Sequence, residues 1–475
     1  MDWTIEQVVA ATGATVVAPP EPGGARRPGP AGPPGRATPP GRATPAGPVS
    51  AGVSIDSRTL VPGDLFVAVR AGRDGHDFAA AAVDAGASAV LVERVTGVAA
   101  TELVVPDTAA ALLDLGRAAR GRLAVPVTGI TGSVGKTSTK DLAAAASSSK
   151  RVVSSPRSFN NELGMPLTLA NAPEDAEMVV LEMGARGPGH IAMLCQVAEP
   201  TIGVVTAVAA AHIEMFGDLD GVAKAKGELV EALPARGVAV LNGDDPRTRA
   251  MVSRTSASTL LYSVEEAAPG RSRPRAGSVR AEVVAEAITL DDELRPRFRL
   301  VSPWGRAEVR LEARGAHQVG NSLAALAVAV LSGVPLDAAV AGLAVGSVSP
   351  LRMEVVITPA GARVINDSYN ANPASVAAAL RALVALPGDR RVAVLGQMAE
   401  LGATGPAEHR SIAALAARLG VELIAVSTPD YGVEPVAPEE VAARLGEVGP
   451  GTAILVKGSR VAALESVAEH LTRPS

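Results

Sequence analysis

The most informative segment of this chain is Thr128-Gly-Ile-Thr-Gly-Ser-Val-Gly-Lys-Thr-Ser138. The apolar run before it, at 123–127, predicts a buried strand, and the alanine-rich run after it, at 139–147, predicts a helix. A glycine-rich loop between a strand and a helix is the context that a phosphate-binding loop requires. Lys136 would reach the outer phosphates of a nucleotide, and the hydroxyl of Thr137 would bind Mg²⁺.

The glycines of this segment do not follow the strict phosphate-loop pattern, because position 130 is an isoleucine. The alternative is an ordinary strand-to-helix turn that carries a surface lysine. The Gly-Lys-Thr sequence at the junction of strand and helix favours the phosphate loop. Glycines there let backbone N–H groups turn towards a phosphate, and the helix N-terminus adds partial positive charge. We expect the nucleotide to contact Gly132, Ser133, Val134, Gly135, Lys136, Thr137 and Ser138.

The composition limits the class of protein. The 475 residues are enough for two to four domains, and with 47% hydrophobic but only 2% aromatic residues the cores must be aliphatic. The net charge of -5 gives no basic surface of the kind that binds nucleic acid. The single cysteine, Cys195, excludes an intrachain disulfide and fits a reducing compartment. We find no signal peptide or membrane-spanning run, and we expect a cytoplasmic monomer without stable membrane insertion.

Residues 1–107 are expected to form a small N-terminal α/β domain. Strands are predicted at 65–69, 89–92 and 104–105, with a helix at 78–85. Residues 19–48 interrupt this domain, because proline, glycine, arginine and alanine dominate there and Pro-Pro-Gly-Arg-Ala-Thr-Pro occurs twice. Such a segment cannot bury enough apolar surface to fold, so we predict a disordered insertion.

Residues 108–350 and 351–475 are expected to form two further domains. In the first of these, strands and helices alternate, which predicts a parallel sheet covered by helices. Its strands are expected at 179–181, 203–206 and 238–241, followed by antiparallel strands within 281–311 and a helix at 315–331. The last domain has strands at 363–365, 391–395, 422–426 and 453–456 and helices at 373–385, 406–418 and 437–446. That alternation predicts a doubly wound, Rossmann-like fold.

Polar side chains near the ends of the predicted strands are candidates for the chemistry. Glu182 follows a buried strand, where a carboxylate could bind Mg²⁺, although a surface carboxylate is the alternative. His212 lies beyond the next strand, and a lone histidine is more often structural than a ligand. Lys224 and Lys226 point in different directions on a helix, so that one could face the phosphate site while the other is solvated.

Two more clusters lie later in the chain. His317 and Asn321 share one face of a predicted helix, and an amide can pair with the edge of adenine. The segment Asn366-Asp-Ser-Tyr-Asn-Ala-Asn-Pro373 lies between a strand and a helix. It holds more polar residues than a plain loop needs, although Asn372 could simply cap the following helix.

Together these motifs resemble the Mur ligase family of ATP-dependent peptidoglycan-precursor ligases. The resemblance covers nearly the whole chain, apart from 19–48 and 265–277. Its most specific segments are Gly132-Ser-Val-Gly-Lys-Thr137, Ser158-Phe-Asn-Asn-Glu-Leu-Gly-Met-Pro166, Glu182-Met-Gly184, Ala223-Lys-Ala-Lys-Gly-Glu228, Asn242-Gly-Asp-Asp-Pro246 and Asp367-Ser-Tyr-Asn-Ala-Asn-Pro373. The last segment favours the member of the family that takes a dipeptide acceptor.

The resemblance implies a three-domain α/β architecture and a defined reaction. In that reaction D-alanyl-D-alanine is joined to UDP-N-acetylmuramoyl-tripeptide, with ATP and Mg²⁺, during peptidoglycan synthesis. The implied catalytic residues are Lys136, Glu182, His212 and Lys226, the last aligned with a lysine that is carbamylated in the family. The implied Mg²⁺ ligands are Thr137, Glu182 and His212, and further nucleotide contacts are Asn321, Arg352 and Asp367. The implied substrate contacts are Ser57, Arg58, Asp74, His76, Asn160, Asn161, Tyr369, Asn370 and Asn372.

Two alternatives to this reaction remain open. A sibling amide ligase, or a folylpolyglutamate synthase-like enzyme, would use the same nucleotide chemistry with another acceptor. A nucleotide-dependent switch would hydrolyse ATP without joining two substrates. Such a switch needs neither a third α/β domain nor the polar segment at 367–373.

Overall fold

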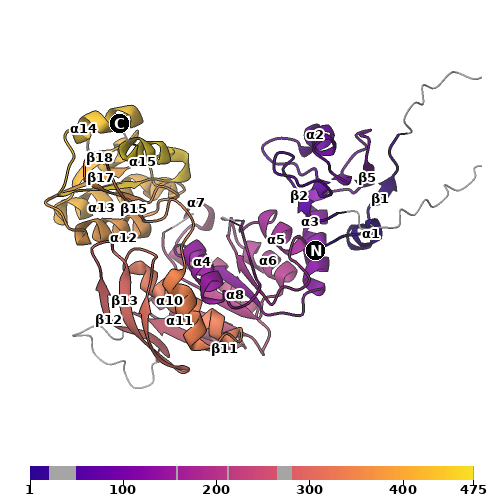
Figure 1. The fold of residues 1–475 in the computed structure, drawn as a ribbon, viewed down its shortest axis with the longest axis horizontal. Helices are drawn as coiled ribbons and strands as arrows, with labels where there is room; N and C mark the ends of the chain where they lie inside the picture. Colours follow the sequence, from indigo (N-terminus) through magenta and orange to yellow (C-terminus); the bar gives the residue numbers. More distant parts are fainter. Residues whose placement is uncertain (21–49, 157–158, 211–212, 265–280, 474–475) are drawn as a thin grey trace, which may run out of the picture. The chain divides into compact units, whose positions relative to one another are not determined.

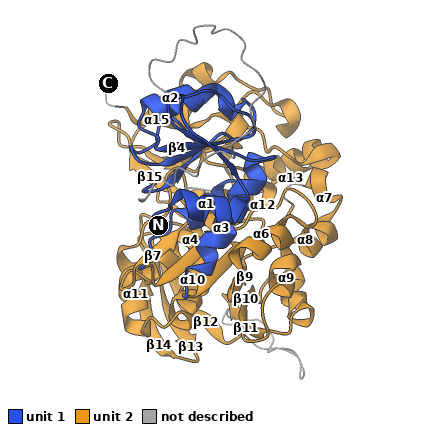
Figure 2. Ribbon diagram, turned by 90° about the vertical axis from the view of Figure 1, so that its right-hand side faces the viewer, with its two compact units in different colours: residues 1–124, 162–175 blue, residues 125–161, 176–475 orange. Residues whose placement is uncertain are grey.

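The structure is a computed structural model, and it describes residues 1–20, 50–156, 159–210, 213–264 and 281–473 (Figure 1). The described residues form three sheets, and they divide into two compact units (Figure 2). Unit 1 comprises residues 1–124 and 162–175, and unit 2 comprises residues 125–161 and 176–475. His212, nearly all of the predicted insertion at 19–48 and all of the predicted loop at 265–277 lie outside the described residues.

Unit 1 is built on a sheet with the strand order β1-β5-β4-β3-β2. Strand β1 pairs with β5 in antiparallel fashion, and the other neighbours are parallel. Its strands are β1 (Thr15–Val17), β2 (Val53–Ser54), β3 (Leu65–Val67), β4 (Ala89–Val92) and β5 (Thr101–Val104). Its helices are α1 (Ile5–Thr12), α2 (Ala79–Asp84), α3 (Thr108–Gly121) and α5 (Gly164–Ala170). Helices α1 and α3 begin at side-chain caps, Thr4 and Asp107, which accept backbone N–H groups of the first turn.

Helix α5 belongs to unit 1 although its sequence lies between two strands of the central sheet. The indole N–H of Trp3 donates to the carbonyl of Ala170 at 3.0 Å. The side chain of Asn171 accepts the N–H of Val53 at 2.8 Å and donates to its carbonyl at 2.9 Å. Each predicted domain contains one of the three sheets, while the predicted boundaries near 107 and 350 remain predictions.

Unit 2 contains a long central sheet with the order β14-β13-β12-β11-β10-β9-β6-β8-β7. Neighbours from β7 to β12 are parallel, whereas β12, β13 and β14 are antiparallel, which confirms the prediction for 281–311. The strands are β6 (Val127–Thr131), β7 (Val152–Ser154), β8 (Met178–Glu182), β9 (Ile202–Val205), β10 (Val238–Asn242), β11 (Ser258–Ser263), β12 (Val283–Leu290), β13 (Pro296–Ser302) and β14 (Gly305–Arg310). The helices are α4 (Lys136–Ala146), α6 (His190–Ala198), α7 (Ile213–Phe216), α8 (Leu219–Glu231), α9 (Pro246–Ala250), α10 (His317–Leu331) and α11 (Leu336–Val345).

Successive side chains of the central strands pack on opposite faces of this sheet. Val204 and Val240 belong to the core that contains residues of α4, α10 and α11. Val205 and Leu241 belong to the core on the other side, with residues of α8. The strands are apolar throughout because helices cover both faces.

The first strand of this sheet begins later than the sequence predicted. We expected 123–127, but β6 is Val127–Thr131, because this stretch forms the ladders with both β8 and β9. Leu123 instead closes the end of α3 through a bond to the Arg120 carbonyl. Gly129 therefore lies in the strand and not in the phosphate loop. A Cβ there would lie 3.0 Å from both Leu229 Cδ1 and Met183 Sδ, so this glycine permits close packing.

The third sheet also lies in unit 2 and has the order β15-β16-β19-β17-β18. Its strands are β15 (Glu354–Ile357), β16 (Arg363–Asn366), β17 (Arg390–Leu395), β18 (Glu422–Ala425) and β19 (Thr452–Lys457), and its helices are α12 (Pro373–Ala385), α13 (Gly405–Arg418), α14 (Val441–Leu445) and α15 (Glu465–Thr472). Residues of α12 and α13 pack on one face and those of α14 and α15 on the other, which confirms the doubly wound prediction. The helix predicted at 437–446 is shorter, because a 3₁₀ turn at Pro438–Glu440 precedes α14. In the described part of the chain, no helix is long and apolar enough to cross a membrane.

Candidate active site

The phosphate loop connects β6 to α4 and depends on two glycines. Gly132 has φ 148° and Gly135 has φ 84°, values that side chains disfavour. A Cβ would lie 1.9 Å from Thr206 Oγ1 at Gly132 and 2.5 Å from Asn321 Oδ1 at Gly135. No side chain caps α4, which begins at Lys136, so its first N–H groups can bind an anion.

Strand β9 and the residues after it anchor this loop. The N–H of Ser133 donates to the Ala207 carbonyl at 2.8 Å, and its hydroxyl donates to the Ala209 carbonyl at 2.9 Å. The hydroxyl of Thr206 donates to the Val134 carbonyl at 2.5 Å. This role of Thr206 was not predicted from the sequence, because it depends on β9 lying beside β6. These bonds to β9 and the residues after it therefore help to hold the loop in shape.

Lys136 lies at the first position of α4. Its ammonium donates to the Gly132 carbonyl at 2.8 Å, so it lies over the loop where phosphates would bind. Burial lowers the pKa of Lys136, the carboxylate of Glu182 opposes this effect, and Arg352 adds to it. A cation in such a desolvated place interacts strongly with an anion.

Thr137 and Glu182 form a pair of oxygen donors at the start of α4 and the end of β8. The Thr137 hydroxyl donates to Glu182 Oε2 at 2.8 Å, and the Asn160 amide donates to Glu182 Oε1 at 2.8 Å. Glu182 is buried, with 2% of its surface exposed. A hydroxyl next to a buried carboxylate fits a hard cation that completes its shell with phosphate and water oxygens. The described residues contain no cluster of three or more His, Cys, Asp or Glu side chains around this pair.

Residues of the third sheet lie against the same loop. Arg352 donates to the Thr137 hydroxyl at 3.0 Å and stacks on the Tyr369 ring, 4.2 Å from its centroid. Asp367 follows β16 and forms an ion pair with Lys457 at 2.6 Å. Lys457 is buried and also donates to the Asn370 carbonyl at 2.8 Å, so it supports the polar segment. Lys457 was not predicted as a site residue, because in the sequence it looks like the ordinary end of a strand.

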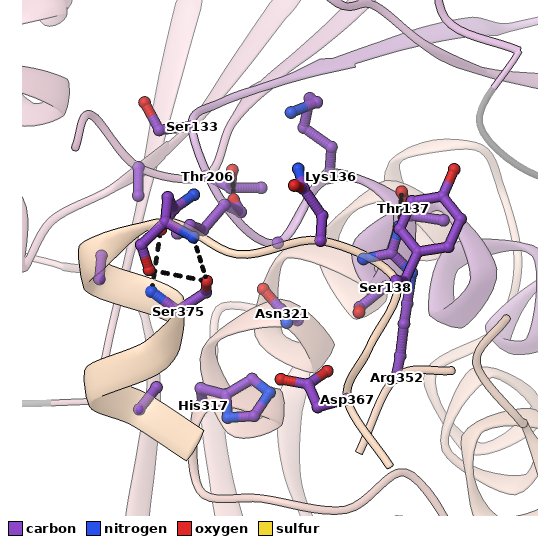
Figure 3. Close-up of a pocket in the computed structure, with 18 of the residues that line it drawn as sticks. Ser133, Lys136, Thr137, Ser138, Thr206, His317, Asn321, Arg352, Asp367 and Ser375 are labelled. Atoms are coloured by element: carbon purple, nitrogen blue, oxygen red, sulfur yellow. Dashed lines mark hydrogen bonds between the residues drawn. The ribbon is translucent and has the colours of Figure 1, made fainter. Parts of the chain in front are cut away.

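The beginning of α10 contributes amide side chains. Asn321 donates to Gln318 Oε1 at 2.9 Å and accepts the hydroxyl of Thr139 at 3.3 Å. These bonds fix the amide of Asn321 beside Gly135. His317 lines the same space one turn earlier, near Asp367 (Figure 3).

One cavity of about 820 Å³ joins these groups (Figure 3). Its lining includes many of the residues predicted to bind nucleotide or substrate: Ser133, Val134, Gly135, Lys136, Thr137, Ser138, Asn160, Glu182, Asn321, Arg352, Asp367, Tyr369, Asn370 and Asn372. Gly132 forms the start of the same loop, whereas Asn161 is next in sequence to Asn160 but does not line the cavity. Asn372 also caps α12 through the N–H of Ser375 at 2.9 Å, the simpler role considered above.

Lys226 does not line the cavity, but it lies close enough to Lys136 for the two charges to interact. It is buried in α8, and burial, with repulsion from Lys136 as the second cause, lowers its pKa from 10.5 to about 7. Lys224 is exposed on the same helix. The structure thus separates the two lysines as the helical spacing predicted, with Lys226 on the side of Lys136.

The four candidate residues of the N-terminal domain lie in unit 1. Ser57 is half-buried, and the exposed Arg58 forms an ion pair with Asp56 at 2.6 Å, which lowers the pKa of Asp56 to about 2. His76 accepts the N–H of Glu93 at Nε2, at 2.8 Å, so its Nδ1 carries the proton that Asp74 accepts at 2.6 Å. Asp74 and His76 therefore stabilise their own loop. Binding of a substrate by these residues remains a prediction.

Three domain models of one family match this chain. They are the Mur ligase family catalytic domain at residues 50–120, the Mur ligase middle domain at 130–329 and the Mur ligase glutamate ligase domain at 351–474. UDP-N-acetylmuramoyl-tripeptide–D-alanyl-D-alanine ligase from Mycobacterium tuberculosis is 40% identical over 89% of this chain and 92% of its own length. The chain belongs to the Mur ligase family.

Other Mur ligases match a similarly large share of this chain. The enzyme of that name from Escherichia coli is 35% identical over 88% of this chain and 93% of its own length. The crystal structure of MurF from Acinetobacter baumannii matches with a TM-score of 0.80, 27% identity and 99% coverage of both chains. MurF ligase from Thermotoga maritima in complex with ADP matches with a TM-score of 0.77, 29% identity and coverage of 89% and 97%. The three-domain Mur ligase architecture is therefore confirmed, and membership of this family implies the use of ATP.

Proposed function

We propose that this protein is an ATP-dependent ligase that joins D-alanyl-D-alanine to UDP-N-acetylmuramoyl-tripeptide in peptidoglycan synthesis. The observation that carries the proposal is the shared cavity, in which a phosphate loop, the Thr137–Glu182 oxygen pair and polar residues of the third sheet all meet. The relatives that match nine tenths of the chain bear the name of this ligase and so indicate its two substrates.

The reaction would proceed in two steps. The terminal carboxylate of the tripeptide attacks the γ-phosphorus of ATP, and the bond to the bridging oxygen of ADP breaks, which gives an acyl phosphate. The amine of D-alanyl-D-alanine then attacks the acyl carbon, loses a proton and displaces inorganic phosphate. Negative charge accumulates on the transferred phosphoryl oxygens, so cationic groups contribute most to catalysis.

The residues of the cavity have separate parts in this proposal. The loop N–H groups and Lys136 would hold the phosphates, while Arg352, which donates to the Thr137 hydroxyl, adds a second cation. Thr137 and Glu182, together with His212, would hold Mg²⁺, which supplies charge neutralisation between carboxylate and triphosphate. Asn321 and Asp367 would contact the nucleoside. Lys226 would support the metal site as a carbamate.

The remaining substrate contacts are assigned by domain. Ser57, Arg58, Asp74 and His76 are proposed for the UDP-linked substrate, as are Asn160 and Asn161. Tyr369, Asn370 and Asn372 are proposed for the acceptor side. A cytoplasmic location and a monomeric state complete the proposal.

Neither alternative explains the cavity as well. A hydrolytic switch needs no third α/β domain, yet Arg352 and Asp367 line the nucleotide cavity. The folylpolyglutamate synthase from Mycobacterium tuberculosis shares only the fold, at 18% identity and a TM-score of 0.56.

The test is a coupled assay of ADP release in which each substrate is omitted in turn. We expect ADP release only with ATP, UDP-N-acetylmuramoyl-tripeptide and D-alanyl-D-alanine together. Glutamate, diaminopimelate and L-alanyl-L-alanine serve as alternative acceptors. Release with ATP alone would indicate a switch, and a preference for a single amino acid would indicate a sibling ligase.

A further inference from the structure

The linker between the central and third sheets follows one face of helix α4. This linker, residues 346–353, leads from the end of α11 to the start of β15. A Cβ at Gly346 would lie 2.6 Å from the Cβ of Ala145, Ser349 bonds to Asp141, and Arg352 bonds to Thr137. Positions 145, 141 and 137 are successive turns on one face of α4. The linker therefore runs along the phosphate-loop helix from its last turn to its first.

Asp141 makes the middle contact, and both of its carboxylate oxygens are used. The N–H and the hydroxyl of Ser349 each donate to Oδ2 at 2.7 Å. The Lys140 ammonium lies 2.7 Å from Oδ1, and only 3% of the Lys140 side chain and 13% of the Asp141 side chain are exposed. Hydrogen bonds to an ionised, mostly buried carboxylate are about twice as strong as neutral ones.

Lys140 also connects, through Ser155, to the backbone of Glu182. Lys140 also donates to the Ser155 carbonyl at 2.8 Å. The Ser155 hydroxyl in turn accepts the N–H of Glu182 at 3.2 Å. One network thus connects the linker, helix α4 and the end of β8, where Glu182 lies.

The backbone on either side of Arg352 is held in an unfavourable conformation. Leu351 has φ 61° and Met353 has φ 54°, and such values for non-glycine residues persist only when surrounding contacts hold them. The Leu351 carbonyl accepts the N–H of Tyr369 at 3.2 Å, and the Met353 N–H donates to Asp367 at 3.2 Å. These contacts hold the end of the linker next to β15, and the Asp141–Ser349 contact holds its middle.

We propose that Asp141 is a positioning residue for the ligation reaction. By holding Ser349 it fixes the register of the linker on α4 and so places the guanidinium of Arg352 at Thr137. Asp141 acts through Arg352 and does not line the cavity itself. This inference rests on the proposed function, which assigns Arg352 and Thr137 to the nucleotide.

The first test compares three substitutions in the linker of the full-length protein. Ser349→Ala removes one of the two bonds to Asp141, and we expect kcat to fall about tenfold, the effect of one hydrogen bond to a charged group. Ser349→Thr keeps the hydroxyl and should restore most of that loss. Ser347→Ala is the matched control, because Ser347 is exposed in the same linker, and its kcat should match the wild type. The KM for the UDP-linked substrate should stay unchanged in all three.

A double-mutant cycle with Arg352→Lys separates positioning from simple stabilisation. If Asp141 and Ser349 act through Arg352, then Ser349→Ala should cause little further loss of kcat in the Arg352→Lys background. Asp141→Asn should behave in the same way. The proposal would be overturned if the kcat of the double variant fell by the product of the two single-variant losses. A wild-type kcat for Ser349→Ala would also overturn it.

The same cycle is also measured as affinity for a fluorescent ATP analogue, which requires no ligation. We expect Ser349→Ala to weaken binding in the wild-type background and not in the Arg352→Lys background. A wild-type protein that binds the analogue but joins no substrates would refute the proposed function alone. Equal weakening in both backgrounds would refute the positioning role alone.

Discussion

The buried position of Lys226 predicts an unusual dependence of stability on pH. Its pKa falls from 10.5 to about 7 in the folded protein, because burial and the nearby Lys136 both disfavour the cation. In the unfolded chain the pKa returns to its ordinary value. The difference corresponds to about 5 kcal/mol, at about 1.4 kcal/mol for each pH unit. Replacing Lys226 with the uncharged Met should therefore stabilise unit 2 at neutral pH.

The sign follows from proton binding. Between the two pKa values the unfolded chain holds the Lys226 proton more often than the folded protein does, so wild-type stability rises with pH in this window. The full penalty applies below the folded pKa, and it disappears above the unfolded pKa. The gain from Lys226→Met should thus be largest at and below about pH 7 and should shrink by about 2.5 kcal/mol between about pH 7.5 and about pH 9.5.

The assay is urea unfolding at a series of pH values, in buffer free of CO₂, divalent metal and nucleotide. The chain has two tryptophans, and Trp3→Phe leaves Trp304, which packs against the core of the central sheet, as the reporter. Lys224→Met is the control, because Lys224 is exposed on the same helix, and its effect should not change with pH. A gain from Lys226→Met that is equal at both pH values would refute the reasoning, since it would then reflect side-chain size and not charge.

Three further predictions concern activity. Lys136→Ala should lower kcat/KM by about 10²–10³-fold, while calorimetry should show unchanged binding of the UDP-linked substrate. Loss of both catalysis and substrate binding would indicate a structural role for the loop. Lys226→Ala should be nearly inactive in the ADP-release assay and partly rescued by acetate, which replaces the carboxylate-like oxygens of a carbamate. Lys224→Ala should retain activity; an inactive Lys224→Ala with an active Lys226→Ala would show that the roles of the two lysines are assigned the wrong way round. Deleting 19–48 and joining the flanks with a short linker should leave the kinetic constants nearly unchanged, because closing a long surface loop costs little; a large rise in KM for the UDP-linked substrate would show that the segment binds it.

The sequence predicted those parts of the site whose signals are local. The loop from Gly132 to Thr137 carries its own pattern of glycines and a lysine next to a helix. Glu182 is marked by the apolar strand that it ends. The doubly wound third domain is marked by regular alternation of strands and helices. Such features can be predicted because they depend only on residues that are neighbours in the sequence.

The sequence did not predict features that depend on which segments become neighbours. Thr206 can hydrogen-bond to the phosphate loop because β9 pairs with β6. Lys457 forms its ion pair with Asp367 because β19 lies beside β16. Neither pairing follows from spacing along the chain. The strand expected at 123–127 was misplaced for a similar reason, since its true register depends on the ladders with β8 and β9. Helix α5 belongs to unit 1 through contacts with Trp3 and Val53, which are more than a hundred residues away.

The proposed ligation requires transfer of the γ-phosphoryl group to the carboxylate of the tripeptide. This can be measured with UDP-N-acetylmuramoyl-tripeptide labelled with ¹⁸O in its terminal carboxylate, supplied with ATP and D-alanyl-D-alanine. Mass spectrometry of the released phosphate should show one ¹⁸O atom for each new amide bond, because the bridging oxygen of the acyl phosphate leaves with the phosphate. Phosphate without ¹⁸O would show that water attacks ATP, and it would contradict the proposed ligation.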